Sequence, residues 1–305
     1  FYECKKHWVS DNAISATAKE TSDIVFDYYL LCSLNLNDRH IGTSQPLLTQ
    51  EILNSIEVDL PPLPDQRAIA ATLSCLDEKI ALNNRINHHL EQMAQAIFKA
   101  WFVDFEPSKP FTEIIQVLGG GTPKTGCIEY WNGSIPFFTP KDTSSTYVLS
   151  TEKTLTESGL NNCNSKLYPT NTVFVTARGT VGKLALAGCS MAMNQSCYAL
   201  IGNKGYGQYF VYHLALNTVE NLKHKANGAV FDAKVTRDFE GEIIPVPPKN
   251  DIQVFEDNVR PIYKSILNNT VENQRLSALR DTLLPRLMSG ELMPSYMECG
   301  GLPPL

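Results

Sequence analysis

Several short motifs in this 305-residue sequence contain residue types that could perform chemistry. Gly179-Thr180-Val181-Gly182-Lys183 ends like a phosphate-binding loop, but the Gly-x-x-x-x-Gly-Lys-Ser/Thr spacing of that loop does not occur in the chain. No Gly-x-Gly-x-x-Gly cofactor loop follows an expected strand, and Leu60 and Val246 stand where an amino-methyltransferase would have Asn before its Pro-Pro pair. The sequence therefore predicts no catalytic residues and no cofactor.

Charged and metal-binding residue types are also present, without the spacing that chemistry needs. Asp77-Glu78-Lys79 could form a nuclease-like set, but it lies on an expected helix where solvent-exposed or partner-facing charges are the simpler interpretation. His88 and His89 are adjacent, so on a helix they point about 100° apart and do not readily share a metal ion. The eight cysteines include no Cys-x-x-Cys pair, which predicts reduced thiols, no metal site and a cytoplasmic location.

Composition limits the class of protein more than it identifies one. Apolar residues make up 43% of the chain, and the length suits about two domains of a globular protein. No apolar run approaches 18 residues, so no membrane span is expected. The net charge of −6 counts against nucleic-acid binding, although residues 111–248 hold 11 Lys and Arg against 10 Asp and Glu. The chain begins with Phe1 rather than Met, which suggests a fragment.

An internal repeat organises the chain. Gly42 matches Gly228, and Leu60-Pro61-Pro62 matches Val246-Pro247-Pro248, at a constant offset of 186 residues. Each Pro-Pro pair ends an extended stretch and opens a long helical pattern, because proline disfavours helical backbone in the residue before it and suits a helix start. Each helix is expected to run for roughly 35–40 residues, or about 55–60 Å.

The two helical patterns share a heptad-like seam of apolar residues that is interrupted by two asparagines in each copy. Two separate amphipathic helices would also explain the seams. Paired asparagines instead favour contact between the helices, since a buried Asn sets register, and the intervening domain makes an antiparallel pair the easier arrangement. The predicted interface consists of Ile80, Asn83, Asn87, Leu90, Ile266, Asn269, Asn273 and Leu276.

The segment between the helices has a different pattern. Short β-type runs at Thr172–Thr176 and Cys197–Ile201 lie between turn residues, and a helical stretch follows near Tyr209–Asn217. This predicts a compact α/β or α+β domain, of which residues 1–59 match only about the last third. The glycines of Gly119–Gly121 are expected to form a strand-end turn with positive φ, or to let the backbone approach DNA closely.

The ordered set of motifs resembles the specificity subunits of type I restriction–modification systems. Gly119-Gly120-Gly121-Thr122-Pro123 is similar to the opening of a target recognition domain in that family. Further similarities occur at Tyr130–Gly133, Ile135–Phe137, Thr156–Leu160, Ala177–Gly182, Asn194-Gln195, Ile244–Pro248 and Leu283–Leu292, and in the first copy at Asp11–Ala13, Gly42–Pro46 and Leu60–Gln66. The resemblance covers nearly all of residues 11–293.

The resemblance implies an α+β fold with a pseudo-repeat, in which α/β target recognition domains are joined by two long antiparallel coiled-coil helices. The expected parts are the end of a truncated first recognition domain (1–59), the first helix (60–106), the second recognition domain (107–245), the second helix (246–293) and a tail (294–305). Such a subunit reads one half of a bipartite site on double-stranded DNA with each recognition domain. It docks two methyltransferase subunits through its helices and joins motor-nuclease subunits in the complex.

Candidate DNA contacts follow from residue type within the second recognition domain. Arg reads guanine, Asn or Gln reads adenine, and Lys mostly contacts phosphate. For each candidate taken singly, an ordinary surface or turn residue, or a core residue for Tyr130, is the simpler interpretation. The DNA sequence recognised does not follow from these residues. A coiled-coil adaptor that binds only protein is the alternative. The candidates are Lys124, Tyr130, Asn132, Lys141, Arg178, Lys183, Asn194, Lys223, Lys225, Lys234 and Arg237, with Lys141 and Arg178 foremost.

Overall fold

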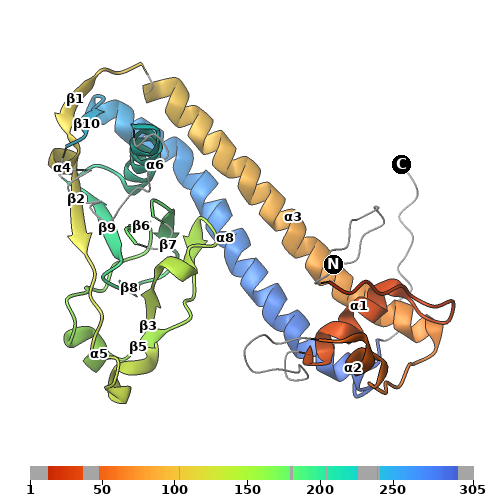
Figure 1. Cartoon of the computed structure of the whole chain (residues 1–305). Helices are drawn as coiled ribbons and strands as arrows, with labels where there is room; N and C mark the ends of the chain where they lie inside the picture. The colour runs from red at the N-terminus through yellow and green to blue at the C-terminus, as the bar shows by residue number, and fades with distance from the viewer. Residues whose placement is uncertain are drawn as a thin grey trace. The chain divides into compact units, whose positions relative to one another are not determined.

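The computed structural model of the chain describes residues 13–36, 48–102, 104–178, 181–203, 205–225, 239 and 241–294. The chain divides into two compact units. Unit 1 contains residues 1–83 and 272–305, and unit 2 contains residues 84–271. Two long helices, α3 (Leu63–Phe102) and α8 (Lys249–Met288), each contribute one end to unit 1 and the other to unit 2 (Figure 1).

Both long helices begin directly after a Pro-Pro pair, as the sequence predicts. The carbonyl of Pro62 accepts from the backbone N–H groups of Asp65 and Gln66, and the carbonyl of Pro248 accepts from those of Asp251 and Ile252. Each helix has 40 residues. Within unit 1, Asp77 contacts Arg280 and Asn83 contacts Asn273. The later residue of α3 thus pairs with the earlier residue of α8, so the two helices run in opposite directions. The predicted pair of long antiparallel helices is therefore confirmed.

Asparagines hold the two helices together in each unit. In unit 1, Asn83 is 1% exposed and its Nδ2 donates to Asn273 Oδ1 at 2.9 Å and to Glu272 Oε2 at 2.7 Å. In unit 2, Asn269 Nδ2 donates to Asn87 Oδ1 at 2.8 Å. The apolar members of the predicted interface differ in burial. Ile266 is buried, whereas Ile80, Leu90 and Leu276 are half-buried.

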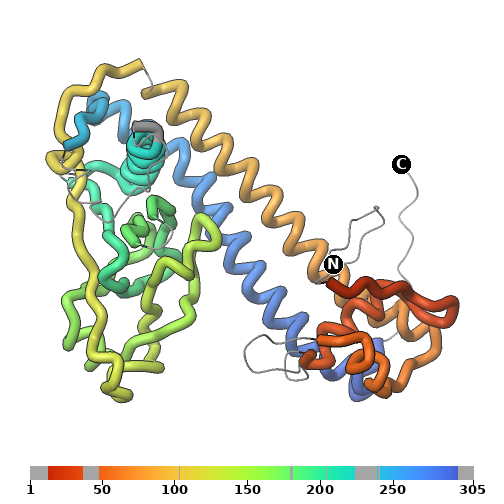
Figure 2. Tube along the Cα trace, in the orientation of Figure 1, coloured from red at the N-terminus to blue at the C-terminus, as the bar shows by residue number. Residues whose placement is uncertain are grey.

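Unit 1 packs a short helix against the ends of the long ones. Helix α1 (Ile24–Ser33) lies beside the start of α3 and the end of α8 (Figure 2). It buries Phe26 and Tyr29 against Ile69 and Leu73 of α3 and Leu287 of α8. Helix α2 (Gln50–Asn54) follows. A hollow of about 830 Å³, lined mainly by aliphatic side chains that include Leu30, Leu34 and Leu53, lies in this unit.

The described residues of unit 2 form three sheets. The five-stranded sheet has the order β2 (Ile115–Gly119), β9 (Cys197–Gly202), β6 (Val173–Thr176), β7 (Leu184–Ala187), β4 (Tyr147–Val148). The three-stranded sheet has the order β5 (Thr154–Leu155), β3 (Trp131–Phe138), β8 (Ala192–Met193). Strands β1 (Pro107–Pro110) and β10 (Ile243–Pro245) form an antiparallel pair. The central strand β6 is buried along its whole length, as its run of apolar residues predicts.

Helices cover one side of the five-stranded sheet and complete the core. Helix α6 (Gln208–Lys225) extends beyond the predicted helical stretch at both ends and packs with α3 and α8. Phe98 and Phe102 of α3 contact Phe210 of α6 and Phe255 of α8, with ring centroids 5.3–5.9 Å apart. The described part of the unit also contains the short helical turns α4 (Phe111–Ile114), η2 (Ile128–Tyr130), η3 (Pro140–Asp142) and α5 (Glu157–Asn161).

The described part of the chain contains neither a membrane-spanning helix nor a cluster of metal ligands. None of its helices is both long and apolar enough to cross a membrane. No group of three His, Cys, Asp or Glu side chains in these residues could hold a metal ion. Six cysteines fall in the described ranges, and all six are free thiols.

Candidate nucleic-acid interface

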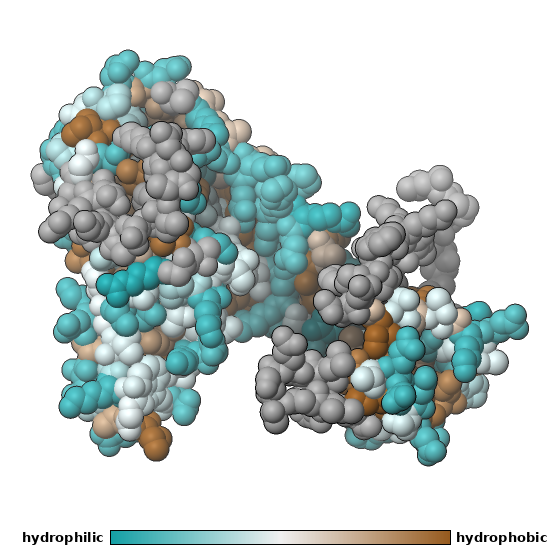
Figure 3. All heavy atoms as spheres, in the orientation of Figure 1, coloured by the Kyte–Doolittle hydropathy of each residue, from teal (hydrophilic) through white to brown (hydrophobic). Residues whose placement is uncertain are grey.

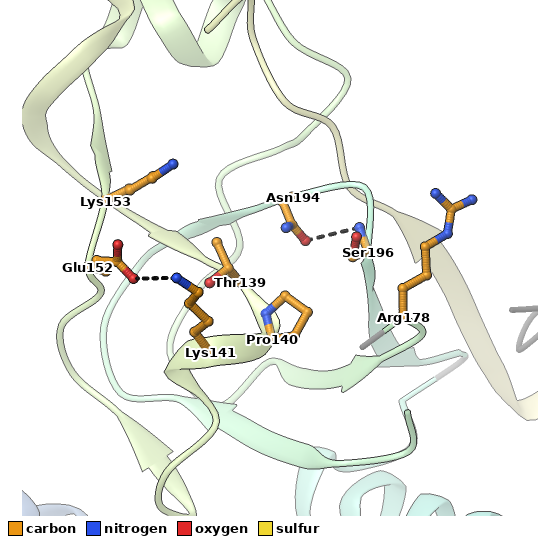
Figure 4. Close-up of a pocket in the computed structure, with 8 residues that line it drawn as sticks. All are labelled: Thr139, Pro140, Lys141, Glu152, Lys153, Arg178, Asn194 and Ser196. Carbon is orange, nitrogen blue, oxygen red and sulfur yellow. Dashed lines mark hydrogen bonds and ion pairs between the residues drawn. The ribbon is translucent and has the colours of Figure 1, made fainter. Parts of the chain in front are cut away.

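A cavity of about 350 Å³ in unit 2 brings together three of the predicted DNA contacts (Figure 4). Lys141 comes from η3 after strand β3, Arg178 follows strand β6, and Asn194 lies between β8 and β9. Loops at the ends of both larger sheets therefore supply the site. Its described lining residues are Thr139, Pro140, Lys141, Glu152, Lys153, Arg178, Asn194 and Ser196.

The side chain of Asn194 is held in one orientation. Its Oδ1 accepts from the backbone N–H of Ser196 at 3.0 Å, and its own backbone N–H donates to Phe138 O at 3.0 Å. The Ser196 N–H uses one of the two lone pairs of Oδ1, so this residue still offers a ligand the two N–H donors of Nδ2 and a second lone pair. A bidentate contact with adenine uses one donor and one acceptor of the amide, so the predicted adenine reading stays a prediction.

The glycine segment before β3 positions Asn194 by close backbone contact. A Cβ on Gly120 would lie 2.1 Å from Asn194 O, and one on Gly121 would lie 2.7 Å from Asn164 N. Gly121 N–H also donates to Met193 O at 3.1 Å. The prediction of positive φ at Gly119–Gly121 is wrong, since the described glycines with positive φ are Gly182, Gly205 and Gly290. Gly120 and Gly121 are instead needed because the backbone at these two positions closely approaches the backbone of Asn194 and Asn164.

Arg178 is exposed at the end of β6, on a well-paired hairpin. The preceding residue, Ala177, is buried, and its N–H donates to Ser196 O at 2.8 Å. Thr176 and Lys183 are joined across the hairpin by the bonds Thr176 N–Lys183 O at 2.9 Å and Lys183 N–Thr176 Oγ1 at 3.0 Å. The backbone on both sides of the turn is therefore fixed, while the guanidinium stays accessible.

Asp142 connects the two segments that carry the other charges of the cavity. Its Oδ2 accepts from the backbone N–H and the hydroxyl of Thr139, both at 2.7 Å, which caps η3. Its Oδ1 accepts from the backbone N–H of Glu152 at 3.0 Å. The Glu152 side chain then lies beside Lys141, with Oε2 3.6 Å from Nζ. This one carboxylate fixes the backbone positions of both partners of the ion pair.

Sequence reasoning missed Glu152, Lys153 and Ser196 as members of the site. Lys153 lies next to the short strand β5, and its Nζ is 5.7 Å from the centre of the Trp131 ring. Two adjacent charged residues of opposite sign look like ordinary exposed surface, so nothing local in the sequence marks Glu152 and Lys153. The pairing of β5 with β3 brings them to the cavity.

The other predicted contacts fall outside this cavity. Lys183 and Lys223 are exposed near Gly182, where a Cβ would lie 3.2 Å from Lys223 Cε. Around η2, Lys124 and Asn132 are exposed and Tyr130 is half-buried, and Asn132 adopts a φ of 61°. Lys234 and Arg237 lie outside the described residues, as does the side chain of Lys225, whose backbone belongs to α6.

The cavity suits binding of an anionic or hydrogen-bonding partner better than catalysis. Its described lining has three cations, two hydroxyls and one amide, while Glu152 is its one carboxylate and is paired with Lys141. Lysine and arginine side chains bind phosphate oxygens, and arginine and amide groups also bind base edges. The visible face of unit 2 is largely hydrophilic outside the grey atoms (Figure 3). The arrangement is therefore consistent with nucleic-acid binding.

Comparison with known proteins identifies relatives over most of the chain. The family described as type I restriction modification DNA specificity domain matches residues 1–92 and 103–274. The HindI specificity subunit of Haemophilus influenzae is 25% identical and is covered over 71% of its length by 81% of this chain. The MjaIX specificity subunit of Methanocaldococcus jannaschii is 26% identical, with 87% of this chain covering 68% of that protein.

A solved structure supports the fold. The S subunit of a type I restriction–modification system from M. genitalium superimposes with a TM-score of 0.54 and 17% identity, covering 90% of this chain and 74% of that one. The family match spans both units and most of the chain. The chain therefore belongs to the family of type I restriction–modification DNA specificity domains.

Proposed function

We propose that this chain confers DNA sequence specificity on a type I restriction–modification complex, with unit 2 reading one half of a bipartite site through the cavity of Lys141, Arg178 and Asn194. The observation that carries this proposal is the convergence of these three residues, each suggested by sequence, from separate loops onto one cavity. Family membership supplies the class of ligand, double-stranded DNA. We also propose a cytoplasmic location, because the six described cysteines are free thiols, as is typical of a reducing compartment.

Binding profiles of an Arg178→Ala variant over a randomised half-site, measured with the methyltransferase partner, test the proposal. If Arg178 reads a base edge, the loss should be about 1–3 kcal/mol at one base position. If it contacts phosphate, the loss should be uniform across sequences and the salt dependence should weaken. Unchanged DNA binding by a folded variant would exclude Arg178 from the interface, and the same result for Lys141→Gln would reject the cavity.

The division into recognition domains and helices is part of the proposal. We assign residues 1–59 to the end of a first recognition domain, 107–245 to a second, and 60–106 and 246–293 to the helical regions, followed by a tail. Moving residues 111–245 into a related subunit should transfer its half-site specificity. A chimaera that folds and assembles but keeps the specificity of its host would contradict the assignment.

We also propose that the long helices dock methyltransferase subunits, through which motor-nuclease subunits join the complex. Leu82, Ile86 and Met93 are 43%, 40% and 55% exposed on α3, and their spacing of four and seven residues places them on one side of the helix. Exposed apolar residues in a row are typical of a partner surface. Replacing all three by Ser should weaken co-purification with the methyltransferase subunit, whereas replacing exposed Glu78 and Arg85 by Ser should affect it less.

We propose that the chain catalyses neither methyl transfer nor DNA cleavage by itself. The support is the lack of a cofactor loop in the sequence and the paired state of Glu152 in the cavity. Incubation of the purified chain with a labelled methyl donor and DNA should give no incorporation until the methyltransferase subunit is added. Incorporation by the chain alone would disprove this part of the proposal.

A further inference from the structure

The described lining of the cavity proposed to bind DNA contains one acidic residue, Glu152, among its three cations. Because DNA is an anion, the presence of this carboxylate needs a physical explanation. Glu152 Oε2 is 3.6 Å from Lys141 Nζ, and the two side chains are 59% and 78% exposed. We propose that Glu152 is a built-in competitor of DNA, which pairs with Lys141 until a backbone phosphate displaces it and thereby limits sequence-independent affinity. This inference rests on the proposed function of the cavity.

The backbone places the Glu152–Lys141 pair. Asp142 accepts from the backbone N–H of Glu152 and also caps the turn that carries Lys141. On the other side of Glu152, Thr151 Oγ1 accepts from Phe137 N–H at 2.9 Å and donates to Lys153 O at 2.6 Å. The backbone of Glu152 is therefore held opposite Lys141 by hydrogen bonds at Glu152 itself and at Thr151.

The neighbouring charged residues Asp142 and Lys153 are engaged elsewhere and do not replace Glu152 as the partner of Lys141. Asp142 already accepts three hydrogen bonds, from Thr139 and from Glu152. Lys153 extends in a different direction from Lys141, and its Nζ lies 5.7 Å from the centre of the Trp131 ring (Figure 4). Glu152 therefore neutralises one particular cation of the cavity, while Arg178 remains exposed.

The exposure of the pair makes it replaceable. Ion pairs between exposed side chains contribute little stability, because water screens them and the side chains lose freedom. A DNA phosphate offers Lys141 an equivalent partner and also releases counterions from DNA. Binding of phosphate leaves the Glu152 carboxylate close to a second negative charge, which weakens the complex. Since phosphate contacts carry no sequence information, the penalty should fall on all DNA sequences alike.

The test uses a Glu152→Gln variant of the full chain assembled with its methyltransferase subunits. We expect DNA affinity to rise for every sequence of a randomised half-site, by up to about fivefold at about 0.1 M salt. The gain should fade as salt increases, and the slope of log affinity against log salt should steepen by up to about 0.9.

Glu113→Gln is the matched control, because Glu113 forms another exposed pair in the same unit, with Lys109 Nζ 2.7 Å from its Oε1, and lies outside the cavity. It changes the net charge equally and should leave DNA affinity nearly unchanged. In a Lys141→Gln background, the gain from Glu152→Gln should largely disappear, because the carboxylate no longer has this cation to occupy.

Three results would overturn the inference. They are an equal gain in Glu113→Gln, an undiminished gain without Lys141, and a change confined to one base position, which would make Glu152 a base reader. Failure of the proposed function would look different. In that case Arg178→Ala and Lys141→Gln would both leave DNA binding intact, whereas failure of this inference alone would leave those two losses in place.

Discussion

Both units are built on the ends of the same two long helices, but they differ in the elements that pack against those ends. In unit 1, α1 packs on the start of α3 and the end of α8, and in unit 2, α6 packs on the start of α8 and the end of α3. Unit 2 adds three sheets and the cationic cavity. The described residues of unit 1 include no strand, and they surround an aliphatic hollow instead. The long helices thus occur without a recognition surface, and in unit 2 the loops of the sheets supply that surface.

In each unit, a buried polar side chain of a long helix accepts a hydrogen bond from the backbone at the start of the helix packed on it, α1 in unit 1 and α6 in unit 2. The two accepting groups differ in charge type. In unit 1, Gln66 Oε1 accepts from Asp23 N–H at 2.9 Å, while its Nε2 donates to Pro61 O at 2.9 Å. In unit 2, Glu256 Oε1 accepts from Phe210 N–H at 2.7 Å. Unit 1 therefore uses a neutral group, and unit 2 an ionisable one.

Exchanging Gln and Glu at these two positions should give the largest difference between the units in the free energy of unfolding. Gln66→Glu places a carboxylate against the Pro61 carbonyl without a donor, so it should cost about 3 kcal/mol of unfolding free energy. Glu256→Gln keeps an oxygen that can accept from Phe210, so its cost should stay below about 1 kcal/mol. Urea unfolding gives the magnitudes, and hydrogen exchange shows which unit opens. Equal losses in the two variants would refute the difference.

Acid should weaken unit 2 through His213. Burial lowers the pKa of His213 from 6.5 to about 3, and its Nε2 lies 2.8 Å from the hydroxyl of Tyr263. The unfolded chain then binds more protons than the folded chain between these two pKa values, so stability falls as pH decreases below 6.5. The loss should reach about 2 kcal/mol at pH 5, at about 1.4 kcal/mol per pH unit.

Glu256 acts in the opposite direction, because burial raises its pKa and the folded chain then binds the extra proton. Comparing pH profiles of unfolding for His213→Gln, Glu256→Gln and their combination separates the two groups. The exposed His88→Gln serves as a control and should keep the dependence of the parent chain. A profile that His213→Gln leaves unchanged would show that this residue does not cause the acid sensitivity.

DNA binding should respond to matched changes in unit 2 and not in unit 1. Asn194→Asp keeps the oxygen that accepts from Ser196 N–H but replaces the N–H donors by an acceptor, so we expect a loss of about 1–3 kcal/mol in DNA affinity. Asn54→Asp makes the same change on the exposed end of α2 in unit 1 and should have little effect. Titrations at one salt concentration compare them. A larger loss of DNA affinity from Asn54→Asp than from Asn194→Asp would contradict the assignment of DNA recognition to unit 2.

The asparagines between the helices should have the smallest effect on stability. Replacing Asn83, Asn87, Asn269 and Asn273 by Leu should raise the unfolding free energy by about 1 kcal/mol and loosen the register of the helix pair. Cysteine crosslinking across the pair, compared between parent and variant, reports register. Lower stability with unchanged register would show that these residues contribute chiefly through their hydrogen bonds.

The periodic spacing of residues along the sequence determined the two long helices, α3 and α8. Apolar spacing, absence of Gly and Pro from Asp65–Phe102, and the repeated Pro-Pro pairs predicted both long helices. These signals are local or repeat at a constant offset, so one sequence contains them. The antiparallel direction also followed, because the domain between the helices leaves little alternative.

Tertiary structure decided which residues form the site. Residue type suggested Lys141, Arg178 and Asn194, but only strand pairing brought them into one cavity with Glu152 and Lys153. It also decided that Gly120 faces the backbone of Asn194, and that the Asn194 amide presents its donors. Contacts between residues far apart in sequence depend on sheet order and register, and no local pattern of residues specifies either one. Sequence therefore determined the helices and the family, while the long-range packing of unit 2 decided the chemistry of its cavity.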